Sequence, residues 1–154
     1  MKRELIDQAL ARVATSRKPD DLRAIIRNAK EKGIDEVARA AQLQLYSILP
    51  SAEPGTLEHD VWQSIHALED ALSSERHKTV RLSRTRQMIQ RVGELDTVSS
   101  LIGKPTASEG FRMLLERDML DLTFEAVALR HPKRFDPATL DLSRARLAAA
   151  DSQD

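Results

Sequence analysis

The residues best placed to do chemistry lie between positions 75 and 91, where the sequence reads ERHKTVRLSRTRQMIQR. Six of them are Arg or Lys and only Glu75 is acidic. The whole chain has 24 basic and 24 acidic residues, so the rest of it has 18 basic and 23 acidic residues, a net charge of minus five. A basic block in a neutral protein indicates an anionic partner, of which nucleic acid is the commonest.

The block has two interpretations. In a helix over 80–92, arginines and glutamines would lie opposite a face formed by Leu82, Thr85, Met88, Ile89 and Val92, and the arginines would contact phosphates. The predicted nucleic-acid-binding residues are Arg76, Lys78, Arg84, Arg86, Arg91, Lys133 and Arg134, with Gln87 and Gln90 available for further hydrogen bonds. In the second interpretation, the block is a solvated face whose arginines pair with carboxylates elsewhere in the chain.

Arg81 does not fit this helical pattern, because it would project into the apolar face. Either the helix begins after Arg81, or its guanidinium is partly buried and needs a carboxylate. Glu58, Glu69 and Glu75 are the candidate partners.

Residues 107–131 could form a helix–turn–helix, with a turn at 118–121 and a second helix from Leu122. The exposed positions of that second helix are expected to include Glu125, with Asp118 and Asp121 just before it, and phosphate would repel all three. We therefore expect an ordinary pair of antiparallel helices.

Histidines and carboxylates near residue 60 suggest a metal site or an enzyme, but weakly. His59, His66, Asp70 and His77 lie close to one helical stripe, yet ligands two turns apart are about 10 Å apart and only His66 and Asp70 could share an ion. We predict no metal site, and we expect the histidines to be exposed.

The same region offers groups for catalysis. Acids could come from Glu58, Asp60, Glu69 and Asp70, and a base from His59 or His66, but no nucleophile motif or phosphate loop accompanies them. No catalytic residue and no cofactor are predicted.

The elements that would position these residues are helices. Aromatic residues make up only 3% of the chain, so a core of Leu, Ile, Val, Ala and Met is expected, which suits helix packing. Apolar periodicity predicts an all-α fold of about seven or eight helices in a hairpin or bundle arrangement, without a sheet. The predicted ranges are 3–15, 19–49 as a helical hairpin turning at Gly33, 56–74, 80–92, 97–102, 106–117, 124–130 and from 137 onward, with N-caps at Thr56, Asp96, Thr106, Thr123 and Asp136.

Proline and glycine in the segment 50–55 predict a boundary between an N-terminal three-helix subdomain, 1–50, and a C-terminal helical subdomain, 56–150. Residues 151–154 are expected to be a frayed tail. The chain has no cysteine, no apolar run long enough for a membrane span and no secretory signal at its start. These features predict a cytoplasmic protein that does not enter a membrane.

Three functions remain open, in order of preference. The first is a non-catalytic accessory module that binds duplex DNA or another nucleic-acid duplex through its backbone. The second is a protein-interaction module, possibly homodimeric, whose basic face docks an acidic partner. The third is an enzyme with a cleft that gathers the carboxylates of 58–70 and arginines of 76–91.

Overall fold

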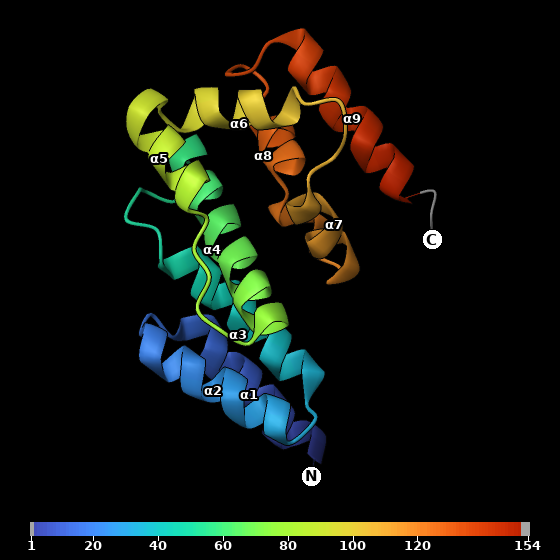
Figure 1. The fold of residues 1–154 in the computed structure, drawn as a ribbon. Helices are drawn as coiled ribbons and strands as arrows, with labels where there is room; N and C mark the ends of the chain where they lie inside the picture. Colours follow the sequence, from blue (N-terminus) through green and yellow to red (C-terminus); the bar gives the residue numbers. More distant parts are fainter. Residues whose placement is uncertain (1, 152–154) are drawn as a thin grey trace. The chain divides into compact units, whose positions relative to one another are not determined.

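The computed structural model describes residues 2–151, and these form nine α-helices, one short 3₁₀ helix and no strand (Figure 1). The all-helical prediction is confirmed, although the helix count exceeds the predicted seven or eight. Gly93, with φ 90° and ψ 170°, is the single residue between the helix that ends at Val92 and the helix that begins at Glu94. No helix within residues 2–151 has both the length and the apolar character needed to cross a membrane. The predicted tail falls mainly on residues 152–154, outside the described part of the chain.

The chain divides into two compact units, which we call unit 1 (Met1–Ser51) and unit 2 (Ala52–Asp154). Unit 1 contains α1 (Lys2–Thr15), α2 (Pro19–Glu31) and α3 (Asp35–Ile48), and both α1 and α2 pack against α3 (Figure 1).

The turn between α2 and α3 depends on Gly33, as predicted. Gly33 has φ 69°, a left-handed conformation that glycine adopts without steric cost. Its N–H donates to the Lys30 carbonyl at 3.2 Å, and the Ile34 N–H donates to the Ala29 carbonyl at 2.9 Å. This pair of hydrogen bonds is a Schellman motif, which satisfies carbonyls at the end of α2 and turns the chain toward α3.

Close helix packing in unit 1 follows from small residues on α3. Ala38 and Ala41 are both buried, and Ala41 lies in one apolar cluster with Val13 and Leu22. Their short side chains allow the helix backbones to approach closely.

The chain passes from unit 1 to unit 2 in the loop 50–55, after which Thr56 begins α4 (Leu57–Arg76). The Thr56 hydroxyl accepts a hydrogen bond from the His59 N–H at 3.1 Å, which confirms the predicted N-cap. Unit 2 continues with α5 (Ser83–Val92), α6 (Glu94–Ile102), α7 (Glu109–Glu116), the 3₁₀ helix η1 (Leu120–Leu122), α8 (Phe124–Arg130) and α9 (Pro137–Asp151).

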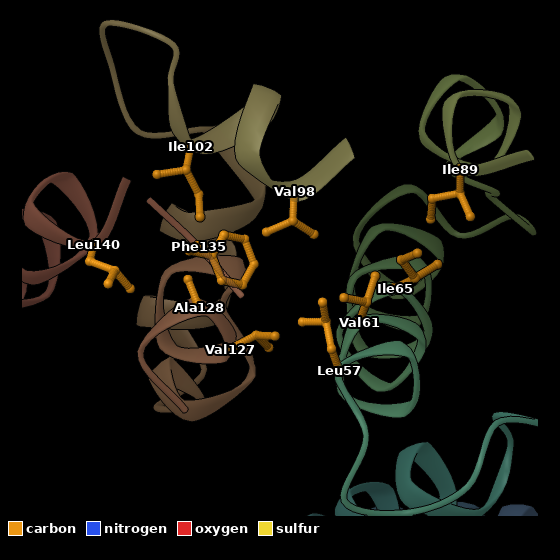
Figure 2. Packing of buried hydrophobic residues seen from close by; sticks show 10 residues of the cluster. All are labelled: Leu57, Val61, Ile65, Ile89, Val98, Ile102, Val127, Ala128, Phe135 and Leu140. Carbon is orange, nitrogen blue, oxygen red and sulfur yellow. The ribbon is translucent and has the colours of Figure 1, made fainter. Parts of the chain in front are cut away.

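The core of unit 2 joins α4 to α5, α6, α8 and α9. Figure 2 shows Leu57, Val61 and Ile65 along one side of α4, facing residues that come from the other helices. The Val61 and Ile65 side chains have no exposed surface. The other members of the cluster are Ile89, Val98, Ile102, Val127, Ala128, Phe135 and Leu140.

Two predicted N-caps are wrong. Helix α6 begins at Glu94, so Asp96 lies within its first turn instead of capping it. Helix α7 is capped by Ser108, whose extended backbone directs its hydroxyl to accept from the Phe111 N–H at 3.1 Å. Thr106, the predicted cap, lies two residues upstream and is not the cap, because Ser108 supplies the oxygen that the first turn needs.

The last two caps are confirmed. The Thr123 hydroxyl accepts from the Ala126 N–H at 3.1 Å and opens α8. The Asp136 carboxylate accepts from the Thr139 N–H at 3.0 Å, and Pro137 occupies the first position of α9. The hydrogen bond from the Thr139 backbone lowers the pKa of Asp136.

Candidate nucleic-acid interface

The basic segment, defined here as residues 76–91, includes the end of α4, the connection 77–82 and nearly all of α5. His77 ends α4 in a left-handed conformation at φ 56°. Ser73 then holds the connection: its hydroxyl accepts from the Val80 N–H at 2.8 Å and donates to the Val80 carbonyl at 3.4 Å. The connection is therefore tied to α4 by hydrogen bonds and not by apolar packing alone.

Glu69 ties the start of α5 to α4. Its carboxylate accepts two hydrogen bonds from the Arg86 guanidinium, both at 2.7 Å, and a third from the Leu82 N–H at 2.8 Å. The side chains of Glu69 and Arg86 are 11% and 26% exposed. The guanidinium carbon also lies 5.1 Å from the centre of the Trp62 ring, a cation–π distance. Arg86 therefore belongs to an internal network in unit 2.

The charges of this network stabilise each other. Burial by itself raises the pKa of Glu69, but the hydrogen bonds from Arg86 and from the Leu82 backbone outweigh it, and the resulting pKa is lowered. The same hydrogen bonds raise the pKa of Arg86 against the opposing effect of burial. Both groups are thus charged at neutral pH.

Arg86 consequently departs from the first interpretation of the basic block, which placed its guanidinium in solvent beside Arg84 and Arg91. It follows the second interpretation instead, because it pairs with a carboxylate elsewhere in the chain, Glu69, and lies against Trp62. The arginine expected to conflict with the apolar face was Arg81. Helix α5 begins after Arg81, at Ser83, so the first of the two alternatives for Arg81 is the observed one, and its side chain is exposed.

The other cations of the basic segment are exposed, and no ion pair is formed by any of them within residues 2–151. These five residues are Arg76, Lys78, Arg81, Arg84 and Arg91, and Gln87 and Gln90 are exposed on α5 with them. On the apolar side of α5, Ile89 is buried, whereas Val92 is 43% exposed although it was predicted to join that face. The structure thus leaves five solvated positive charges on one continuous segment.

Lys133 and Arg134 lie in the connection between α8 and α9, on a separate element of unit 2. Lys133 is exposed. Arg134 is 3.7 Å from the Glu58 carboxylate, with both side chains well exposed, so this is a weak surface pair. Arg134 is therefore less available to an outside anion than Lys133.

Residues 107–131 form two helices, α7 and α8, with η1 between them. Glu125, expected to be exposed, is instead buried, with 6% of its side chain exposed. It pairs at 3.0 Å with Arg146 of α9, which also donates to the Lys104 carbonyl. The expectation was wrong because α9, far along the sequence, covers this face of α8.

Asp60 forms a contact that sequence reasoning missed. Its carboxylate lies 2.7 Å from His131 Nε2 and 3.4 Å from Arg130 Nε, at the end of α8. Asp60 and His131 are 71 residues apart, so no local spacing signals the pair.

The histidines of α4 are less exposed than expected. His59 is buried and His66 half-buried, whereas His77 is exposed. Within the described residues, no three His, Asp or Glu side chains are grouped as a metal ion would require.

Comparison with protein-family models, with curated proteins and with solved structures gave no match to this chain.

Proposed function

We propose that this protein is a non-catalytic module that binds the backbone of a nucleic-acid duplex through the basic segment. The observation that carries the proposal is the charge separation around α5: one buried carboxylate, Glu69, is used by one arginine, Arg86, while five neighbouring cations remain in solvent. In a chain with a net charge of zero, surface arginines would ordinarily be interspersed with acids. A row of cations without such acids suits a polyanion.

The chemistry of the segment favours phosphate contacts over base recognition. Arginine and lysine bind phosphate oxygens, and these contacts position a protein on a duplex without reading its sequence. Stacking on single-stranded bases would need aromatic side chains. The chain has one Trp and one Tyr, and Trp62 is half-buried beneath Arg86 while Tyr46 is buried in unit 1.

The proposed roles differ within the segment. Arg84 and Arg91 on α5, with Arg76, Lys78 and Arg81 before it, are proposed to contact phosphates, and Lys133 to add to them. Arg86 is proposed to act indirectly, by fixing α5 against α4 through Glu69. This division makes Arg84 and Arg91 the residues to test, because neither makes a contact that the fold needs.

The test is a fluorescence-anisotropy titration of a labelled DNA duplex at several salt concentrations. Five phosphate contacts from the basic segment, and a sixth from Lys133, predict that the logarithm of the binding constant falls with the logarithm of salt concentration with a slope of about −5. Arg84→Ala with Arg91→Ala should reduce that slope by about two. The matched control is Arg27→Ala with Lys30→Ala, which removes two exposed cations from α2 of unit 1.

The result that would overturn the proposal is equally specific. Salt-independent binding, or equal losses in the two double variants, would exclude the basic segment as the contact surface. Capture of a partner that survives nuclease treatment of a lysate, with no duplex binding by the purified protein, would instead favour an acidic protein partner.

A further inference from the structure

Unit 1 carries an apolar groove of about 420 Å³ where α1, α2 and the start of α3 come together. Ile6, Ile25 and Val37 line it, one from each helix. Leu5 lies in the same lining and is 66% exposed, the most exposed large apolar side chain among the described residues. A single exposed leucine is ordinary, but one that continues an apolar groove marks a surface that a partner can cover.

The charged residues that line the groove are all cations. They are Lys2 and Arg12 on α1 and Lys32 at the end of α2, and none of them forms an ion pair within residues 2–151. The lining contains no Asp or Glu, although Glu4, Glu31 and Asp35 lie close to these cations in the sequence. Asp7 and Glu36 also lie outside the lining, and both are bonded to Arg3. The lining of the groove therefore combines an apolar floor with three cations and no carboxylate.

The spacing of the cations indicates the shape of the ligand. Lys2 and Arg12 are ten residues apart on one helix, which places their Cα atoms about 15 Å apart along its axis. A single carboxylate, such as that of a fatty acid, pairs with both cations only if the two long side chains converge on it between their Cα atoms. A ligand with several carboxylates spread along an apolar face pairs with the cations without that rearrangement, and therefore matches the groove better.

We infer that unit 1 binds an acidic amphipathic helix of a protein partner in this groove. Apolar side chains of that helix would cover Leu5, Ile6 and Ile25, and carboxylates along its edges would pair with Lys2, Arg12 and Lys32. This is the helix-in-groove mode of recognition, in which apolar anchors supply affinity and flanking charges supply selectivity. The inference is independent of the proposed nucleic-acid contact, because the basic segment belongs to unit 2.

The test uses the full chain and two synthetic helical peptides with the same leucine face. One peptide carries Glu at the flanking positions and the other carries Lys. Titrations followed by ¹H–¹⁵N correlation spectra should show the acidic peptide shifting the amides of Leu5, Ile6 and Ile25, while the basic peptide shifts none of them.

Two pairs of variants sharpen the experiment. Leu5→Glu should weaken the acidic peptide about tenfold or more, because it places a charge on the apolar contact. The control Leu142→Glu changes another exposed leucine, on α9, and should leave the affinity unchanged. Arg12→Glu with Lys32→Glu should abolish the preference for the acidic peptide, whereas Arg27→Glu with Lys30→Glu, at exposed positions outside the groove, should preserve it. The six sites changed in these four variants are all exposed, so circular dichroism should show the wild-type helix content.

Three outcomes would overturn the inference. The first is equal affinity for the two peptides, or amide shifts confined to residues 76–91. The second is a dimer in sedimentation velocity that Leu5→Glu dissociates, which would make a second copy of this chain the occupant. The third is that neither peptide binds while laurate binds saturably in the groove, which would identify a small amphipathic anion as the occupant.

Discussion

Replacing Glu69 by Gln should destabilise unit 2 by about 3 kcal/mol, because it removes the carboxylate that pairs with Arg86. Removing one partner of a buried ion pair costs about 3–5 kcal/mol, since the other charge stays buried. The lower end applies here because the Arg86 side chain keeps 26% of its surface in water. Gln keeps the shape of Glu and can still accept from Leu82, so the loss is mainly that of the charge-assisted bonds to Arg86.

Urea unfolding followed by tryptophan fluorescence measures this loss directly. Trp62 is the only tryptophan of the chain, and its ring lies 5.1 Å from the Arg86 guanidinium carbon. The urea midpoint should fall while the dependence on urea concentration stays unchanged, because the same surface is exposed on unfolding. Glu116→Gln is the control: Glu116 pairs with Arg112 at 2.6 Å, but both side chains are at least half exposed, and solvent screens such pairs.

A double variant separates the pair from its surroundings. Glu69→Leu combined with Arg86→Met replaces both charges by apolar groups and should cost less than Glu69→Leu alone, because no charge is left without a partner. The single variants Glu69→Leu and Arg86→Met are measured beside the double variant. If their losses of stability simply add in the double variant, the pair does not hold α5 to α4. The same conclusion follows if Glu69→Gln loses no more stability than Glu116→Gln.

The pH dependence has a defined sign. The pKa of Glu69 in the folded protein is lowered from its ordinary value of 4.5, so the folded state favours the ionised carboxylate. Its contribution to stability is complete above about pH 4.5 and is lost as the pH falls through the lowered pKa. The stability difference between the wild type and Glu69→Gln should therefore narrow below that pH. If the stability difference between the wild type and Glu69→Gln stays constant down to about pH 2 to 3, Glu69 is not ionised in the folded protein, because its protonation would then not be linked to unfolding.

Two further predictions concern the same unit. Ser108→Ala should lower the free energy of unfolding by about 1 kcal/mol because it removes the N-cap of α7, whereas Thr106→Ala should have little effect. If urea unfolding shows the larger loss for Thr106→Ala, Thr106 is the cap and this prediction is wrong. Glu125→Ala should lower the free energy of unfolding by about 3 kcal/mol or more, because it leaves the Arg146 guanidinium buried without its carboxylate. A loss in urea unfolding smaller than that of Ser108→Ala would show that this ion pair does not stabilise the fold.

Much of the fold could be predicted because its determinants are local. Pro19, Gly33, Thr56 and Thr123 act through hydrogen bonds or backbone angles that involve residues within five positions. Apolar spacing at the helical period identified the helices themselves, among them the one predicted at 56–74 that the structure shows as α4. The failure at Thr106 was also local, because two hydroxyl residues compete for one cap and the sequence pattern does not rank them.

The sequence by itself determined that this chain is helical, where most of its helices begin and end, and that positive charge collects in residues 76–91. Only the tertiary structure decided which charges remain in solvent. Arg86 pairs with a carboxylate 17 residues away, and Glu125 with a guanidinium 21 residues away. Helical periodicity gives the side of a helix on which a residue lies, but the partner across the core depends on how helices pack, and that packing is a sum of many contacts distant in sequence.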